Sequence, residues 1–284
     1  MSWKRIAAAG VGVAALLWAA TASAELPGGG AKAGLHCPLE PGRSSFEIGS
    51  GNRARAVEIE IGPRARKGAP APVVFLWHGW GGNPRQMLDA LDLARTWPEA
   101  VAVAPHGLPR RFPGMGPRTH PGWQIRAGEF DDRDLRLFDA LVRKLSRLEC
   151  LDATRFTSSG FSNGGYFSNL LGCRRAGVLA AVAPVAGGGP YEDSCEAPVA
   201  AWIAHGSRDQ VVPIREGRKS FATWQGRNAC DIGEPDSEGC TQAKDCTEPV
   251  VLCTFESGHT WPHRLSSKWR RFLRDQRLPV TKRP

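Results

Sequence analysis

Short runs of apolar residues recur along this sequence, and each run ends at a glycine-rich or polar turn. A strand that is apolar at every position is buried on both faces, as in a parallel sheet that helices cover on each side. Between the runs, apolar residues recur at helical spacing. The expected buried strands are residues 73–77, 100–104, 179–185, 199–204 and 250–255. This alternation predicts a single α/β domain with a doubly wound, mostly parallel sheet and right-handed crossovers.

The segments around these strands complete the expected fold. Residues 44–48 and 57–61 predict an opening hairpin, because apolar and acidic residues alternate along the second segment as in a half-buried strand. A connection rich in Pro, Gly and aromatic residues spans 105–128, and so long a connection is usually functional or disordered. Helices are expected at residues 84–97, 131–148, 214–224 and 265–277.

The first 24 residues have the pattern of a secretory signal peptide. Lys4 and Arg5 precede an apolar run over residues 6–20, and Ala22-Ser23-Ala24 supplies small residues for cleavage. The apolar run is too short, and its flanks are wrong, for a retained membrane helix. We therefore expect a signal peptide over residues 1–24 and one domain over residues 25–284. The product would be secreted, extracellular or periplasmic, and would not stay in the membrane.

The cysteines support the same compartment. An even number in a secreted chain predicts disulfides. Four of them crowd between Cys230 and Cys253, but no C-x-x-C pair occurs there, so disulfides are favoured over zinc. The pairing is left open. The eight residues are Cys37, Cys150, Cys173, Cys195, Cys230, Cys240, Cys246 and Cys253.

The charge balance is basic, with a formal net charge of +9 at pH 7. Lys and Arg residues are scattered rather than clustered with aromatic residues, so nucleic acid is not expected as a partner. A solubilising surface explains this charge better. No internal repeat is found, and the sequence leaves the oligomeric state open.

One short stretch, residues 155–165 with the sequence RFTSSGFSNGG, carries the chemistry. Its centre, Gly160-Phe161-Ser162-Asn163-Gly164, fits the G-x-S-x-G nucleophile elbow between a strand and a helix. A serine at such a turn has a strained backbone, and side chains at the two glycines would collide with the neighbouring elements. Ser162 is therefore the candidate nucleophile.

A serine nucleophile needs a base and an acid that orients the base, and in α/β-hydrolases these follow in the order Ser, acid, His. Asp209 and His259 satisfy that order, and each follows an expected buried strand. The rival acids lie before a strand or in the cysteine-rich segment: Asp193, Asp231, Asp236 and Asp245. Of the rival histidines, His205 precedes the acid and His263 begins a helix. We expect Ser162, Asp209 and His259 to meet at the carboxyl ends of the strands.

The same pattern predicts an oxyanion hole from two backbone N–H groups. One belongs to the residue after the nucleophile, Asn163, and the other to the loop after the strand at 73–77. In that loop, His78-Gly79-Trp80-Gly81-Gly82, we expect Trp80 to donate and His78 to brace the loop.

Five blocks of this sequence resemble the secreted feruloyl esterase and polyhydroxybutyrate depolymerase family, close to the carbohydrate esterases that include acetyl xylan esterases. The blocks are residues 78–83, 160–165, 181–187, 205–213 and 258–262, and the resemblance spans about Phe46 to Phe272. It implies an α/β-hydrolase fold, a triad of Ser162, Asp209 and His259, and no metal or organic cofactor. The sequence departs from the family at Trp80, where a small residue or cysteine is common, and at residues 240–246, which look like an insertion.

The sequence thus predicts a secreted serine esterase with an acyl-enzyme mechanism. Its expected substrates are feruloyl- or acetyl-type esters of plant polysaccharide or its fragments. Trp80, Trp123 and Trp261 are expected to stack on a sugar or aryl ring of the substrate. An extracellular poly(3-hydroxybutyrate) depolymerase needs the same triad and a shallow apolar groove, so it stays an alternative. A catalytically silent extracellular binding protein on the same fold is disfavoured by the intact triad, and a peptidase is less favoured.

Overall fold

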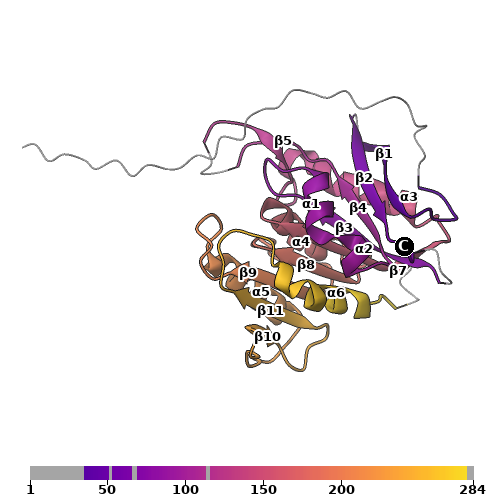
Figure 1. The fold of residues 1–284 in the computed structure, drawn as a ribbon. Helices are drawn as coiled ribbons and strands as arrows, with labels where there is room; N and C mark the ends of the chain where they lie inside the picture. The colour runs from indigo at the N-terminus through magenta and orange to yellow at the C-terminus, as the bar shows by residue number, and fades with distance from the viewer. Residues whose placement is uncertain (1–34, 51–52, 66–68, 113–115, 280–284) are drawn as a thin grey trace, which may run out of the picture. The chain divides into compact units, whose positions relative to one another are not determined.

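A nine-stranded sheet forms the centre of the computed structural model, which describes residues 35–50, 53–65, 69–112 and 116–279. The expected signal peptide, residues 1–24, lies outside the described residues. The strand order is β1-β2-β4-β3-β7-β8-β9-β11-β10 (Figure 1). The strands are β1 Gly42–Ser50, β2 Arg53–Ile61, β3 Ala71–Trp77, β4 Val101–Pro105, β7 Leu151–Phe161, β8 Ala181–Val185, β9 Ala200–Gly206, β10 Cys240–Gln242 and β11 Val250–Phe255.

The strands β3, β4, β7, β8, β9 and β11 pair in parallel, whereas β1, β2 and β10 join the sheet antiparallel. Each residue of β3, β4, β8 and β9 is buried, as the all-apolar runs predict. The expected mostly parallel sheet and the opening hairpin are therefore confirmed.

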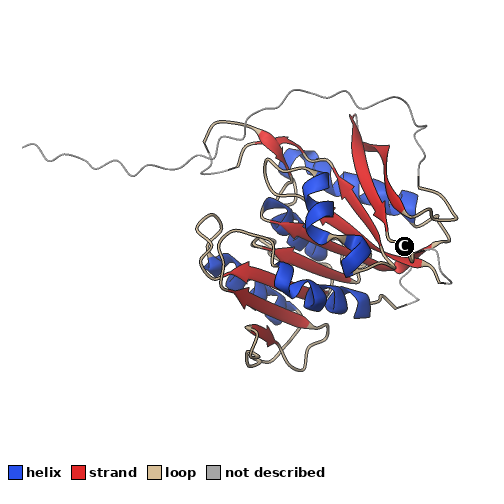
Figure 2. Cartoon of the chain, viewed as in Figure 1, coloured by secondary structure: helices blue, strands red, loops and turns tan. Residues whose placement is uncertain are grey.

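Helices cover both faces of the sheet (Figure 2), and alternate residues of β3 point into two separate cores. Phe75 packs in the core that α3, α4 and α5 cover, and Leu76 packs in the core under α1, α2 and α6. This arrangement confirms the doubly wound α/β-hydrolase fold. The helices are α1 Pro84–Leu91, α2 Leu93–Thr96, α3 Arg133–Leu145, α4 Asn163–Arg174, α5 Ile214–Arg227 and α6 Ser266–Asp275, with 3-10 turns at Glu129–Asp132 and His263–Leu265.

Several element boundaries differ from the expectation for local reasons. Asn83 begins α1 with a capping box, but Asp92 takes a left-handed conformation with φ 47° and divides the helix expected at 84–97 into α1 and α2. The helix expected at 131–148 begins at Arg133, after a turn with positive φ values. The connection over 105–128 contains a small hairpin of β5 Leu108–Arg110 and β6 His120–Gly122.

All eight cysteines form disulfides, which confirms the preference for disulfides over zinc. The pairs are Cys37–Cys150, Cys173–Cys195, Cys230–Cys246 and Cys240–Cys253. Cys240 and Cys253 face each other in the ladder between β10 and β11, so this bridge holds the edge strand on the sheet. A bridge typically stabilises a fold by about 2–4 kcal/mol.

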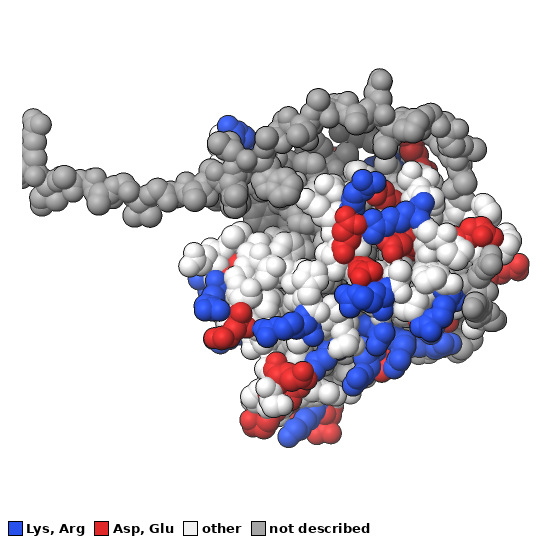
Figure 3. Space-filling model, in the orientation of Figure 1, with Lys and Arg blue, Asp and Glu red and all other residues white. Residues whose placement is uncertain are grey.

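The surface carries charges of both signs. On the face drawn in Figure 3, Lys and Arg side chains lie beside Asp and Glu side chains rather than in a field of one sign. Several basic residues form ion pairs, such as Arg64 with Glu99 at 2.7 Å. In the part of the chain that is described, no helix has the length and apolarity needed to cross a membrane.

Candidate active site

Ser162 occupies the sharp turn between β7 and α4, where sequence analysis expects a nucleophile elbow. Its backbone has φ 55° and ψ −119°, a region that costs a non-glycine residue about 1–3 kcal/mol. The Ser162 N–H donates to the Val185 carbonyl at 2.9 Å, and its carbonyl accepts from Gly165 N–H at 2.8 Å. Hydrogen bonds from the next strand and from the helix therefore hold the strained residue in place.

The glycines around Ser162 are required by close backbone approaches. A Cβ on Gly160 would collide with the Gly164 carbonyl, and a Cβ on Gly164 would collide with the Trp77 carbonyl. A Cβ on Gly165 would lie 2.8 Å from the Val185 oxygen. The steric reason that the sequence pattern predicts is confirmed: larger residues here would push α4 away from β3 and β8.

Asp209 and His259 form a hydrogen-bonded pair at the carboxyl ends of β9 and β11. The His259 Nδ1–H donates to Asp209 Oδ2 at 2.7 Å. The other carboxylate oxygen, Oδ1, accepts the N–H groups of Val211 and Val212, each at 2.9 Å. The carboxylate is fully buried, and the His259 side chain is 17% exposed. Because Nδ1 carries the proton, Nε2 of His259 is free to act as a base.

The His259 ring also lies close to the elbow. Its centroid is 4.7 Å from that of Phe161, the residue before Ser162. Elements from three parts of the chain therefore converge here. The rival acid Asp236 instead forms an exposed ion pair with Lys268 at 2.8 Å, which lowers the pKa of Asp236 to about 2. Asp193 and His263 are exposed, and the structure gives neither of them a place beside His259 or Asp209.

The loop after β3 runs directly beside the elbow. A Cβ added to Gly79 would lie 3.4 Å from Ser162 Cβ. The buried His78 ring donates from Nδ1 to the Gly79 carbonyl at 2.7 Å and accepts the Gly107 N–H at Nε2, at 3.0 Å. Burial lowers the pKa of His78 to about 4, so the neutral ring keeps both bonds. This geometry agrees with the expectation that His78 braces the loop.

The two expected oxyanion donors have free backbone N–H groups. Within the described residues, neither Trp80 nor Asn163 uses its N–H in a hydrogen bond, and Asn163 is the first residue of α4. The Asn163 side chain instead clamps the backbone of Trp123, accepting its N–H at 2.7 Å and donating to its carbonyl at 2.9 Å. The Trp80 indole donates to the Arg110 carbonyl at 3.0 Å.

The three tryptophans expected to contact substrate differ in burial. Trp123 is 0% exposed, its ring lies 5.0 Å from Trp77, and its Nε1–H donates to the His78 carbonyl at 2.9 Å. The structure exposes no part of the Trp123 ring for the expected substrate contact, because the ring is part of the core beneath the loop after β3. Trp80 is partly exposed. Trp261 is 9% exposed and lines a pocket of about 660 Å³ next to the His259 loop.

Sequence reasoning missed a row of aromatic side chains between Trp80 and α5. The Phe112 ring lies 6.5 Å from Trp80 and 6.2 Å from Tyr166, and Tyr191 lies 5.9 Å from Tyr166. The Tyr191 hydroxyl donates to Glu216 at 2.9 Å, and burial raises the pKa of Tyr166. Tyr166 could have been found, since it follows Ser162 by one helical turn, but Phe112 and Tyr191 lie far away in sequence.

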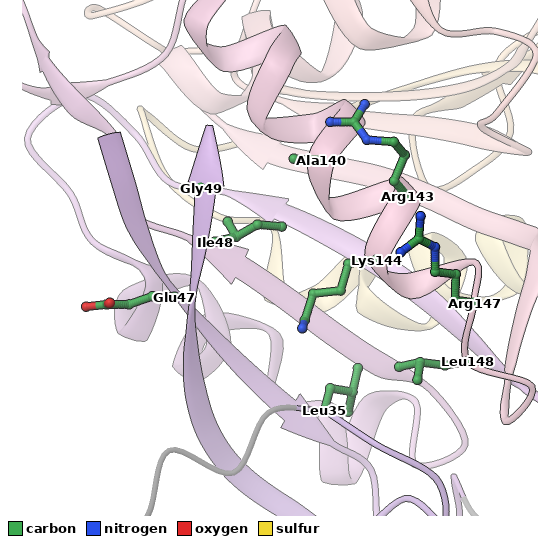
Figure 4. A pocket seen from close by; sticks show the side chains of 9 residues that line it. All are labelled: Leu35, Glu47, Ile48, Gly49, Ala140, Arg143, Lys144, Arg147 and Leu148. Atoms are coloured by element: carbon green, nitrogen blue, oxygen red, sulfur yellow. The ribbon is translucent and has the colours of Figure 1, made fainter. Parts of the chain in front are cut away.

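A separate groove lies between β1 and α3, away from these groups. It has a volume of about 520 Å³, with Ile48 and Leu148 on its walls. Figure 4 shows Arg143 projecting from α3, Arg147 just beyond the end of that helix, and Lys144 extending toward β1. None of the residues that line this groove belongs to the elbow, the loop after β3 or the Asp209–His259 pair.

Comparisons with known proteins were made for the whole sequence and the structure. No family model matches the chain. Feruloyl esterase C from Emericella nidulans is 29% identical over 207 residues, which cover 67% of this chain and 70% of that protein. Feruloyl esterase D from Neurospora crassa is 27% identical over 222 residues, with coverage of 68% and 71%.

Among solved structures, an acetyl xylan esterase from Aspergillus awamori superposes with a TM-score of 0.58 at 13% identity. The match covers 81% of this chain and 99% of that one, and at this identity it bears on the fold alone. The predicted resemblance to feruloyl esterases is confirmed, and the comparisons support a carboxylic ester hydrolase.

Proposed function

We propose that this protein is a secreted serine esterase that cleaves carboxylic esters through a covalent acyl-enzyme. Ser162 is the nucleophile, His259 the general base and Asp209 the acid that orients it. The observation that carries the proposal is a strained serine elbow next to a buried Asp–His pair with a 2.7 Å hydrogen bond. The similarity to feruloyl esterases supports the same reaction.

Acylation begins when Nε2 of His259 takes the Ser162 hydroxyl proton and Oγ attacks the ester carbonyl carbon. Asp209 keeps the imidazole in the required tautomer and stabilises the imidazolium that forms. The backbone N–H groups of Trp80 and Asn163 donate to the oxyanion, and one such donor is typically worth about two to three powers of ten in rate. The imidazolium then gives its proton to the leaving alcohol oxygen as the ester C–O bond breaks.

Deacylation repeats these steps with water. His259 takes a proton from water, the hydroxide oxygen attacks the acyl carbon, and the same two N–H groups hold the second oxyanion. Collapse of this intermediate breaks the bond to Ser162 Oγ, which recovers its proton from the imidazolium, and the carboxylic acid leaves.

The proposed substrates are feruloyl- or acetyl-type esters carried by plant polysaccharide or its fragments. Two features support an aryl acyl group and a sugar alcohol. The partly exposed Trp80 begins a row of aromatic side chains that continues through Phe112 and Tyr166 beside the elbow helix. On the other side, Trp261 and Thr260 line a pocket that adjoins the His259 loop.

Secretion is part of the proposal, with cleavage after Ala24 leaving a domain of residues 25–284. The four disulfides support an oxidising compartment. Expression of the full chain with its own leader tests this step, and the mass of the exported protein gives the cleavage site. An exported protein that still begins at Met1, or no export at all, would contradict it.

A substrate panel tests the reaction. It contains methyl ferulate, feruloylated and acetylated xylan, short-chain nitrophenyl esters and emulsified poly(3-hydroxybutyrate), each with wild type beside Ser162→Ala. We expect cleavage of the feruloyl or acetyl esters by wild type alone. Turnover of the hydroxybutyrate polymer alone would favour a depolymerase. If no ester is cleaved, or if the alanine variant cleaves as fast as wild type, the esterase proposal is contradicted. A catalytically silent binding protein would then be the favoured alternative.

A further inference from the structure

His205 lies buried against the candidate acid, and the proposed mechanism does not use it. It is the penultimate residue of β9, and its side chain is 0% exposed. Its Nε2 lies 2.7 Å from the Val212 carbonyl oxygen and 3.5 Å from Asp209 Oδ2. The same Asp209 oxygen accepts the His259 Nδ1–H at 2.7 Å. One carboxylate oxygen therefore lies between two imidazole rings.

The contacts of His205 fix its tautomer. A carbonyl oxygen only accepts hydrogen bonds, so the proton is on Nε2 and points at Val212. Nδ1 is buried without a hydrogen-bond partner among the described residues. The backbone of α5 packs against it so closely that a Cβ on Gly217 would lie 2.6 Å from Nδ1. Burial also lowers the pKa of His205, so the ring is neutral.

From this arrangement we infer that His205 is a positioning residue for the Asp209–His259 pair. Its Nε2–H holds the Val212 carbonyl, and Nε2 lies 3.5 Å from the Asp209 oxygen that orients His259. The turn over residues 209–212 is then fixed twice, because Asp209 Oδ1 already accepts the Val211 and Val212 N–H groups. This inference rests on the proposed function, since a positioned base matters only if Ser162 is the nucleophile.

The dipole of His205 has a consequence for the pH dependence of the reaction. An N–H group near a carboxylate oxygen stabilises the negative charge on that oxygen. The carboxylate then attracts a protonated imidazole less strongly. Without this group, we expect Asp209 to bind the imidazolium form of the base more strongly. The charged groups around His205 are Asp209, His259 and Glu216 of α5, and all three stay in the variants below.

Two variants separate a positioning role from a purely structural one. His205→Gln keeps an N–H donor near the Nε2 position, whereas His205→Phe fills the space without a donor. For His205→Phe we expect kcat on the best ester of the panel to fall about tenfold with KM unchanged. The acid limb of its kcat/KM profile should move up by about 0.5 pH unit. His205→Gln should restore the wild-type limb and most of kcat.

If the acid limb of the kcat/KM profile does not move in His205→Phe, the inference is overturned. Equal decreases of kcat in the two variants would also overturn it. A readout that needs no esterase activity is nuclear magnetic resonance of wild type labelled with ¹⁵N histidine. Nδ1 of His205 should show the shift of an unprotonated nitrogen at neutral pH, and a protonated Nδ1 would overturn the inference. If no ester is cleaved, the proposed function fails, whereas the tautomer of His205 is still decided by this spectrum.

Discussion

The Asp209 carboxylate and the His259 imidazole are joined by a 2.7 Å hydrogen bond although 50 residues separate them in sequence. The sheet explains this contact. The strands β9 and β11 are parallel neighbours, and Gly206 lies opposite Phe255 at their carboxyl ends. The loops that follow the two strands therefore start side by side, three or four residues before the acid and the base. Sheet register sets the distance between the two side chains.

The first prediction concerns the strain stored at Ser162. Ser162→Gly should raise the free energy of unfolding by about 1 kcal/mol relative to Ser162→Ala, because glycine takes a positive φ without a Cβ clash. Both variants should lose about four to six powers of ten in esterase rate. Urea unfolding of the two variants provides the comparison. Equal stability would show that the turn is not strained.

The second prediction concerns the tautomer of His259. Asp209→Asn should lower kcat by about 10⁴-fold, because an amide donates to Nδ1 and moves the imidazole proton to Nε2, where the base is needed. The matched control is Asp236→Asn, which removes an exposed carboxylate paired with Lys268. Steady-state kinetics should show wild-type activity in the control. Similar losses in both variants would remove Asp209 from its proposed role.

Much of this site could be predicted because its signals are local. The G-x-S-x-G turn specifies its own backbone, and apolar runs followed by polar turns mark the strand ends where Asp209 and His259 lie. The helix expected from residue 84 begins there, because the Asn83 side chain forms a capping box.

The features that could not be predicted depend on contacts between distant segments. Trp123 follows β6 in an irregular connection, and distant residues fix its position: Trp77 and Phe167 pack on its ring, and Asn163 binds its backbone. In the sequence, His205 follows directly after an expected buried strand. The residues beside it in the sequence do not indicate that its side chain contacts Val212 and Asp209. The pairing of the cysteines likewise follows from the sheet register, as at Cys240 and Cys253.

The third prediction concerns stability at acidic pH. Burial lowers the pKa of His78 to about 4, whereas an unfolded histidine has a value of about 6.5. Between these two pH values the histidine is protonated in the unfolded chain but neutral in the folded chain. The free energy of unfolding therefore decreases by about 3 kcal/mol as the pH falls from about 6.5 to 4. Urea unfolding at pH 7 and 4.5 measures this loss. His78→Asn should show a smaller loss between the two pH values, and an equal loss would contradict the prediction.

The fourth prediction compares two disulfides. Cys37–Cys150 joins residues 113 apart in sequence, whereas Cys240–Cys253 joins residues 13 apart. In the chain-entropy model, a disulfide that closes a longer loop stabilises the folded state more. The expected stabilisation is about 4–5 kcal/mol for Cys37–Cys150 and about 3 kcal/mol for Cys240–Cys253. Paired Cys→Ser variants at each bridge, unfolded in urea, test the order. A larger loss at Cys240–Cys253 would indicate that holding β10 on the sheet outweighs loop closure.

The last prediction separates the acyl side of the site from the alcohol side. Trp80→Ala removes an indole that packs against Phe112 and His120 but keeps the backbone N–H proposed for the oxyanion. For methyl ferulate, kcat/KM should fall about tenfold, because the aryl ring loses an aromatic contact, whereas nitrophenyl acetate should change by less than about threefold.

Trp261→Ala is the matched variant on the side of the His259 loop, where it opens the pocket that Thr260 also lines. It should weaken turnover of feruloylated xylan fragments, mainly through KM, and leave methyl ferulate near wild type, since methanol is too small to reach that pocket. Steady-state kinetics on the three esters should show that each variant loses activity on a different substrate. If Trp80→Ala slows the acetate ester as much as the ferulate ester, the indole shapes the oxyanion loop rather than the acyl pocket.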